Sequence, residues 1–387
     1  MMNQQDADVA ILGAGPVGSA LALLLASGAR QPERIVVLHA DRASAYGHET
    51  TADPRVLAIN HGSRVLLEHL GAWPDRAAPI QTIHVSQRGR LGRTLIGHEE
   101  FGVPALGYVV RYSDLHQSLL TALAASGVTL LAGDTAEVVS QQHGLAHVQQ
   151  GSRRLTTRLV VQADGRPDSQ IQRTYKQMAL ITQANASQPK DGWAFERFTR
   201  EGPLAVLPHP ARPGMQSIVW CCTPERAAAL QRLEHNRFSD ALSETFGSRL
   251  GRLEVDGPIH AFPLILNLDP DPADGVVIAI GNAAQTLHPV AGQGLNLGLR
   301  DAGMLAQTLR HWLGGYPGEV SSMLSEFVRR RWADRHLTAS LTDTMSRVFT
   351  TRSPLVEHAG GIALLALDLS AGLRRPLGRH LLQGLRG

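Results

Sequence analysis

The sequence contains little cysteine and little net charge. Only two of its 387 residues are cysteines, the neighbours Cys221 and Cys222. Adjacent residues of a strand point to opposite faces, so a mutual disulfide or a metal site is not expected, and reduced thiols are the better interpretation. The formal charge of +3 comes without the concentrated basic stripe of a nucleic-acid-binding protein.

A long hydrophobic run is also absent. The apolar segment at residues 19–29 is too short to cross a bilayer, and the N-terminus lacks the pattern of a secretory signal. We therefore expect a cytoplasmic protein. With 43% hydrophobic and 18% charged residues, a chain of 387 residues suits two globular domains of ordinary size.

A glycine-rich turn follows the first predicted strand. Residues 9–12 indicate a buried strand, GAGPVG occupies residues 13–18, and residues 19–26 continue as an apolar helix. Glycines in this pattern permit a tight turn, let the backbone approach phosphates, and let helix and strand pack closely. The helix N-terminus adds unpaired N–H groups and partial positive charge. This context favours a dinucleotide site over a glycine turn without a ligand.

The contact to the adenosine ribose departs from the usual pattern. The strand at residues 35–40 carries His39 where an acidic residue is typical. Asp41 could serve if the loop bends, or His39 could itself donate the hydrogen bond. No second G-x-G-x-x-G follows a strand, which argues against a separate pyridine-nucleotide domain.

Three separated stretches resemble the class A flavoprotein aromatic hydroxylases, the para-hydroxybenzoate hydroxylase superfamily. They are the glycine turn at residues 13–18, ADG at 163–165, and GNAAQTLHPVAGQGLNLG at 281–298. The likeness is greatest to the ubiquinone-biosynthesis hydroxylases, whose late motif reads HP-x-AGQG-x-N-x-G. The letters GNAAQTLHP, together with WAFERFTREGPLAVLP at 193–208, are similar to the subgroup that hydroxylates polyprenyl methoxyphenols.

The resemblance implies tightly held FAD, NAD(P)H as a transient co-substrate, and O2 as oxidant. In this family a flavin C4a-hydroperoxide passes one oxygen atom to a phenol ring, here that of a polyprenyl methoxyphenol in ubiquinone biosynthesis. A ubiquinone-biosynthesis complex is a further partner that the resemblance suggests. Two alternatives stay open: a related hydroxylase acting at another ring position or on a soluble aromatic, and a non-catalytic accessory flavoprotein.

The expected fold is α/β, with a Rossmann-like FAD-binding domain interleaved with a β-sheet substrate domain and followed by a helical C-terminus. Residues 1–79, 105–175 and 272–310 are assigned to the FAD-binding domain, 80–104 and 176–271 to the β-sheet domain, and 311–387 to the helical region.

The expected cofactor-binding residues lie mainly in and around the two glycine-rich turns. They are Gly13, Gly15, Gly18, Asp41, Arg55, Arg111, Asp164, Gly165, Gly281, Asn282, Gly292, Gln293, Gly294, Leu295 and Asn296, with Gln117 as a weaker candidate. A helix is predicted to begin near Gly294 or Leu295 and to direct its N–H groups at the flavin. Asn282 replaces the family's aspartate and can still form hydrogen bonds with the ribityl chain.

Two features concern the reductant and the cofactor phosphates. The resemblance implies that Arg55 lies near the FAD phosphates or the mobile flavin, and the alternative is an exposed arginine on the surface. The family uses the loop after Asp164 for FAD and the passing nicotinamide. That loop is shorter here by on the order of ten residues, so Ser169 and Arg173 are not expected in their usual places.

His288 and Pro289 are predicted to line the substrate pocket, with His288 either structural or catalytic. The sequence identifies no general base for the phenol and no metal site. The segments AVLP (205–208), SIVWCC (217–222) and HAFPLIL (260–266) are expected to provide apolar lining or sheet core.

The C-terminal segment from residue 359 is apolar and carries Arg374, Arg375, Arg379 and Arg386. It favours either peripheral contact with an anionic membrane surface or an ordinary helix packed on the domain.

Overall fold

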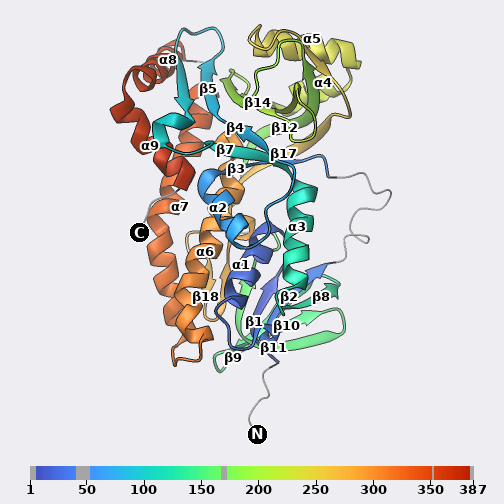
Figure 1. Ribbon diagram of the computed structural model, residues 1–387, viewed down its shortest axis with the longest axis vertical. Coiled ribbons are helices and arrows are strands. Elements are labelled where there is room, and N and C mark those ends of the chain that lie inside the picture. Colours follow the sequence, from blue (N-terminus) through green and yellow to red (C-terminus); the bar gives the residue numbers. More distant parts are fainter. Residues whose placement is uncertain (1–5, 41–52, 167–171, 351–352, 384–387) are drawn as a thin grey trace.

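The computed structural model describes residues 6–40, 53–166, 172–350 and 353–383. The architecture is α/β with a helical C-terminal part (Figure 1), which confirms the expected fold class. Asp41, Ser169 and Arg386 lie outside the described residues. The assignment of sequence ranges to three regions stays a prediction.

The first sheet has eight strands, and its central strands run parallel. β1 (Ala7–Leu12) lies between β2 (Ile35–Ala40) and β11 (Arg153–Gln162). β8 (Thr129–Gly133) pairs with β2, and β19 (Val277–Ala279) pairs with β11, while β9 (Ala136–Gln142), β10 (Leu145–Gln150) and β18 (Ala273–Asp274) complete the sheet. The central strands are runs of buried aliphatic residues because helices cover a parallel sheet on its faces.

The second sheet has nine strands and lies at the top of Figure 1. Its order is β20 (Gln285–Thr286), β17 (His260–Leu268), β12 (Gln172–Ala186), β15 (Met215–Cys222), β14 (Pro203–Pro208), β13 (Trp193–Phe198), β5 (Thr82–Gln87) and β6 (Arg93–Gly97), with β16 (Leu253–Val255) beside β12. Trp220, Phe238 and Phe246 form a core between one face of this sheet and the helices α4 (Pro224–Gln231) and α5 (His235–Phe246). The other face is left for the C-terminal helices and for a cavity.

A small sheet joins the two larger layers. β7 (Gly107–Arg111) lies between β3 (Val56–Asn60) and β4 (Ala78–Ile80), and the three strands appear between the large sheets in Figure 1. The helices α2 (His61–His69) and α3 (Tyr112–Ala124) follow β3 and β7 directly.

The C-terminal helices connect both ends of the molecule. α1 (Pro16–Ala26) packs against α6 (Gln293–Leu313) beside the first sheet, and α7 (Val320–Thr350) runs along α6 towards the second sheet (Figure 1). α8 (Pro354–Leu369) then folds back over β5 and β6, and α9 (Ala371–Gln383) packs beside α8, α2 and β3. Within the described residues no single helix is both long and apolar enough to cross a membrane, and α8 with α9 meets those criteria only as a pair bent by 95°.

A buried polar cluster explains the glutamine in the late motif. The amide of Gln285, fully buried, donates to the Asp301 carboxylate and accepts from the Arg335 guanidinium. An amide can do both at once. Arg331 completes the cluster by pairing with Asp301 at 2.8 Å, so the late turn is tied to α6 and α7.

Candidate functional site

Three stretches far apart in the sequence meet at the carboxyl ends of neighbouring strands. Gly13 follows β1, Asp164 follows β11, and Gly281 follows β19. A Cβ atom on Gly13, whose φ is +112°, would lie 2.6 Å from the Asp164 Cα. A Cβ on Gly18 would lie 2.1 Å from the Gly13 carbonyl oxygen. These glycines are therefore required by close backbone packing, at the edge where open α/β sheets bind ligands.

Two helix N-termini open at this edge. Gly15 is the N-cap of α1 and Gly292 is the N-cap of α6, and neither helix has a side-chain cap or an acidic residue in its first turn. A Cβ built on Gly15 or on Gly294 would meet no atom within 4 Å. Both sets of N–H groups thus have free space beside them, as a bound anionic group requires.

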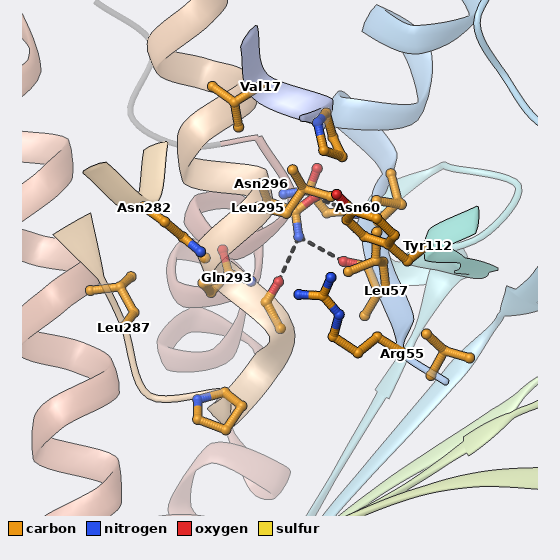
Figure 2. Close-up of a pocket in the computed structure, with 18 of the residues that line it drawn as sticks. Val17, Arg55, Leu57, Asn60, Tyr112, Asn282, Leu287, Gln293, Leu295 and Asn296 are labelled. Atoms are coloured by element: carbon orange, nitrogen blue, oxygen red, sulfur yellow. Dashed lines mark hydrogen bonds between the residues drawn. The ribbon is translucent and has the colours of Figure 1, made fainter. Parts of the chain in front are cut away.

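Both N-termini line one large cavity of about 1040 Å³, which continues to the second sheet. Figure 2 shows part of it, with Arg55, Tyr112, Asn282, Gln293 and Asn296 around the space. Of the predicted residues, the lining includes Gly13, Gly15, Arg55, Asp164, Gly165, Asn282, Pro289, Gly292, Gln293, Gly294, Leu295 and Asn296. His39 also lines it.

Gly18 and Gly281 lie behind this lining. A Cβ on Gly281, whose φ is +61°, would lie 3.2 Å from the methyl groups of Val17. Gly292 has a similar reason to be glycine, because its Cβ would lie 2.9 Å from the Cβ of Ala58 on β3. These positions shape the site through packing, whereas Gly15 and Gly294 leave room inside it.

Asn296 fixes the start of α6 against β3. Its Nδ2 donates to the carbonyl oxygens of Ala58 at 2.8 Å and Gly292 at 2.7 Å, and both hydrogen bonds are drawn as dashed lines in Figure 2. Its Oδ1 accepts from the Asn60 N–H at 2.9 Å. Both amide hydrogens are therefore used within the protein, and Asn296 orders the turn.

Arg55 enters the cavity as part of an ion pair. Its Nε lies 2.8 Å from Asp53 Oδ1, and its guanidinium lies 4.3 Å from the ring centroid of Tyr112. Its side chain lies at the cavity wall and is still 42% exposed, so contact with the cofactor stays a prediction.

Arg111 does not line the cavity. It is the N-cap residue of α3, and its positive charge acts on His209, whose pKa falls to about 4 through burial first and Arg111 second. On α3 the cavity-lining side chains are Tyr112 and His116, which are one turn apart, while Gln117 is exposed. His116 Nε2 contacts the Ala14 carbonyl oxygen at 2.9 Å and so holds the first glycine turn in place.

His288 is buried and is not among the residues that line the cavity, contrary to the prediction that it lines the pocket. Its Nε2 donates to Gln177 Oε1 at 3.0 Å, and its Nδ1 accepts from the Val290 N–H at 3.3 Å. Burial lowers the pKa of His288 to about 4, so the imidazole is neutral. Pro289 does line the cavity.

Asp164 and Arg166 lie at the cavity edge nearest the first glycine turn. Burial raises the pKa of Asp164, although its Oδ1 accepts from the Arg166 N–H at 3.1 Å. Arg166 Nη2 donates to Thr135 Oγ1 at 2.8 Å. Gly165 lies beside Asn282, with its Cβ position 3.8 Å from the Asn282 Cβ, so the second and third motifs meet here.

The second sheet forms the far wall of the cavity, here called the floor. The residues that line it are Ile83, Val85, Thr94, Ile96, Ala194, Phe195, Glu196, Ala205, Leu207 and Val219, of which Phe195 directs its ring into the core on the other face, against Phe246. The segments 205–208 and 217–222 contribute, as predicted. The segment 260–266 is absent from the lining, because β17 lies on the far side of β12 and β15 from these strands.

Helices α8 and α9 close the cavity opposite the floor. Leu364 and Leu367 of α8 and Leu377 and Leu381 of α9 line it. Arg374, which also lines it, pairs with Glu100 at 2.8 Å. This arm of the cavity is therefore mainly aliphatic.

Comparison with known proteins assigns a family to this arrangement. A family model described as an FAD binding domain matches residues 6–333. Ubiquinone hydroxylase UbiL of Rhodospirillum rubrum is 31% identical over 98% of this chain and 90% of that protein. The 3-demethoxyubiquinol 3-hydroxylase of Escherichia coli is 29% identical over 97% of this chain and 98% of that protein.

A solved structure of similar fold is that of p-nitrophenol 4-monooxygenase PnpA from Pseudomonas putida DLL-E4. It has a TM-score of 0.76 and 17% identity, and it covers 99% of this chain and 100% of that one. The chain belongs to the FAD-dependent aromatic hydroxylases. It is accordingly an FAD-dependent aromatic monooxygenase, as the resemblance of its three motifs predicted.

The cavity of this hydroxylase fits FAD. The two uncapped helix N-termini open into one space, with empty Cβ positions at Gly15 and Gly294. Such N–H groups suit a pyrophosphate and the electron-rich edge of a reduced flavin. The cavity also continues beyond both helix N-termini, along the floor and the α8–α9 arm, so it has room for a second molecule beside FAD.

Proposed function

We propose that this hydroxylase adds one oxygen atom to the aromatic ring of a polyprenyl methoxyphenol in ubiquinone biosynthesis. The observation that carries the proposal is the single cavity that joins the nucleotide-type edge of the first sheet to an aliphatic floor and an aliphatic arm. The names of the relatives, matched over nearly the full chain, support the same pathway.

The cofactor would be held by backbone more than by side chains. The N–H groups at Gly15 and the start of α1 would bind the pyrophosphate, and those at Gly294 and Leu295 would face the flavin. Asn282 would form hydrogen bonds with the ribityl chain, and His39 would reach the ribose. FAD, when bound, supplies the reduced ring that activates O2. NAD(P)H would deliver the hydride from the side of Asp164 and Gly165.

The floor favours a neutral, apolar substrate ring over an aromatic acid. The only titratable side chain among the floor residues named above is the Glu196 carboxyl group, so the floor offers no cation to pair with a benzoate, and the ionised form of Glu196 would repel one. The arginine side chains that line the cavity lie outside the floor, and two of them, Arg55 and Arg374, are already paired with carboxylates. A soluble aromatic acid is therefore the less favoured substrate, and a phenol is the more favoured one.

The aliphatic arm suits a polyprenyl tail, and it leads to a second apolar surface. On the outer side of α8, Leu355, Ile362, Leu365 and Leu369 are exposed, with Leu355 84% and Leu369 79% accessible. Their spacing of three to seven residues places them on one stripe of the helix. Because Leu364 and Leu367 face the cavity, α8 is apolar on both sides. We therefore propose that this outer stripe rests on a lipid bilayer from which the substrate enters.

The basic tail has a smaller part in this contact than its sequence indicates. Arg374 and Arg375 both pair with Glu100, at 2.8 and 3.4 Å, and the α9 side chains His380 and Leu382 are buried. Helix α9 thus packs on the domain, and the apolar stripe of α8 is the proposed bilayer contact.

Turnover tests the proposed activity. The purified holoenzyme should oxidise NADH or NADPH faster when a methoxyphenol with a short prenyl chain is present, and mass spectrometry with NMR of the product should show one added ring hydroxyl and its position. Substrate-independent oxidation that yields only hydrogen peroxide would contradict the proposal and favour an accessory flavoprotein.

Vesicle sedimentation tests the bilayer contact. The double variant Ile362→Ser/Leu369→Ser should sediment less with phosphatidylcholine–phosphatidylglycerol vesicles than the parent protein. Val139→Ser is the control, because Val139 is 62% exposed on β9, in the first sheet. Equal sedimentation of all three proteins would refute the contact.

A further inference from the structure

We propose that Glu196 is the catalytic base that accepts the phenol proton of the substrate. The inference rests on the proposed function, because it requires a phenol on the floor of the cavity. It adds a residue with a chemical role to the floor, whose other lining residues are apolar apart from Thr94.

The register of the second sheet places Glu196 at the centre of the floor. Across neighbouring strands, Glu196 is opposite Val85 on β5 and Ala205 on β14. The row continues to Thr94 on β6 and to Val219 on β15. All five of these side chains line the cavity. A single row across five strands therefore holds one carboxyl group between aliphatic neighbours.

The adjacent row is apolar throughout. Ala194, two residues before Glu196, is opposite Ile83, which is in turn opposite Ile96, and all three line the cavity. Residues two apart in a strand share a face, so these side chains and Glu196 form one surface. A substrate ring lying on this surface meets one polar group able to accept a proton.

Glu196 has no competing partner in the described part of the chain: no hydrogen bond or ion pair to its carboxylate is found there. Thr94, the other polar side chain of the row, donates its hydroxyl to the Leu364 carbonyl oxygen at 2.6 Å. The adjacent Arg197 donates to the Thr245 carbonyl oxygen at 3.0 Å, and neighbours in a strand point to opposite faces. The carboxylate is thus left for a ligand.

The electrostatic surroundings suit a base. Burial raises the pKa of Glu196 to about 8, and no charged group contributes to the change. Of the titratable groups around it, Cys221 on β15 is close, and burial keeps the pKa of that thiol well above its usual range, so it stays neutral. The facing helices contribute Met345 and Leu364, which carry no charge, and Arg374, whose guanidinium is paired with Glu100 at 2.8 Å. A carboxylate with a raised pKa is a stronger proton acceptor, better matched to a phenol whose pKa is near 10.

The proton transfer balances within the pair. The phenol O–H bond breaks and its electron pair stays on the oxygen, which gives a phenolate, while the proton forms a new O–H bond with the Glu196 carboxylate. The proton later leaves to solvent, which restores the base. No further oxidant or reductant enters this step.

Binding and rapid kinetics together test the assignment. The probes are 2-methoxyphenol with a short prenyl chain and its methyl ether, which cannot donate a proton. In the holoenzyme, preference for the phenol over the ether should rise about tenfold from below to above pH 8, because a hydrogen bond to a charged acceptor replaces one to a neutral acid. The rate of hydroxylation after mixing the reduced complex with O2 should rise through the same pH range.

The variant Glu196→Gln should lose the pH dependence of both quantities, with hydroxylation slowed by about 100-fold or more. Glu196→Asp, which keeps a carboxylate, should regain part of the rate and the pH dependence. Glu254→Gln is the control, because Glu254 lies on β16 in the same sheet and is 68% exposed.

The outcomes separate the two proposals. If wild type hydroxylates the phenol and Glu196→Gln shows the same pH profile and the same preference, the role of Glu196 is refuted while the proposed function stands. If wild type neither prefers nor hydroxylates the phenol, both are refuted. An unchanged flavin spectrum and melting temperature show that a variant has folded with its cofactor.

Discussion

Two glycines on one helix should respond to alanine in opposite ways. Gly294 and Gly298 both lie in α6, one turn apart. A Cβ on Gly294 meets nothing within 4 Å, whereas a Cβ on Gly298 would lie 2.7 Å from Val17 Cγ2 and 3.1 Å from the Gly281 Cα. The same substitution therefore adds a methyl group to open cavity at one position and to a packed helix contact at the other.

The magnitudes follow from helix propensity and packing. Replacing a helical glycine with alanine stabilises a helix by up to about 1 kcal/mol. Overpacking typically costs about 1–3 kcal/mol. Gly294→Ala should therefore leave the unfolding free energy of the FAD-free protein unchanged or raised by up to about 1 kcal/mol, and Gly298→Ala should lower it by about 1–2 kcal/mol.

For FAD affinity the two variants should rank in the opposite order, with Gly294→Ala the more damaging substitution. If the flavin contacts the backbone at Gly294, an added methyl group displaces it, and the Kd for FAD should rise about tenfold or more. Urea denaturation followed by circular dichroism measures stability, and quenching of flavin fluorescence measures binding. Tight FAD binding by Gly294→Ala, and equally by the larger Gly294→Leu, would refute the placement of the flavin at the start of α6.

Three other predictions concern the buried polar groups and the aliphatic arm. Because burial raises the pKa of Glu196 to about 8, its ionisation favours the unfolded state between about pH 4.5 and 8. Each pKa unit corresponds to about 1.4 kcal/mol of unfolding free energy. In urea titrations Glu196→Gln should therefore be more stable than wild type at pH 8 by more than about 1 kcal/mol, and it should gain no stability at pH 4. Arg331→Met should lower the unfolding free energy by about 3–5 kcal/mol, since it leaves Asp301 and Asp334 buried with a lost partner, and a loss below about 1 kcal/mol in the same assay would contradict this. Leu367→Trp should narrow the arm and raise KM about tenfold for a long-chain prenyl phenol, with little change for a chain-free methoxyphenol, and equal effects on both would argue against the arm as the tail site.

The glycine turns could be predicted from the sequence because their requirements are local. A strand, a glycine pattern and an apolar helix follow one another in a few residues, and the structure places Gly13, Gly15 and Gly294 at the cavity. The family resemblance then assigned FAD, and the match to an FAD binding domain confirmed that cofactor.

Side-chain roles that depend on distant partners could not be predicted in this way. Asn296 was expected to bind cofactor, but both of its amide hydrogens are used on Ala58 and Gly292. His288 lies in the motif, yet only the position of Gln177 on β12 decides that it points into protein.

The same limit applies to the sheet. Alternation in WAFERF places Ala194 and Glu196 on one face, but it does not say which face meets the cavity. Only the pairing of β13 with β5 and β14 shows that Glu196 lies on the floor. Strand order also explains why residues 260–266 are absent from the lining, since β17 lies beyond β12 and β15.

Isotope labelling tests the central claim most directly. The reduced holoenzyme, mixed in a single turnover with oxygen-18 gas and a short-chain prenyl methoxyphenol, should yield a ring-hydroxylated product carrying one labelled oxygen atom per enzyme-bound flavin oxidised. Reoxidation of the flavin with labelled hydrogen peroxide and unchanged phenol would contradict the account.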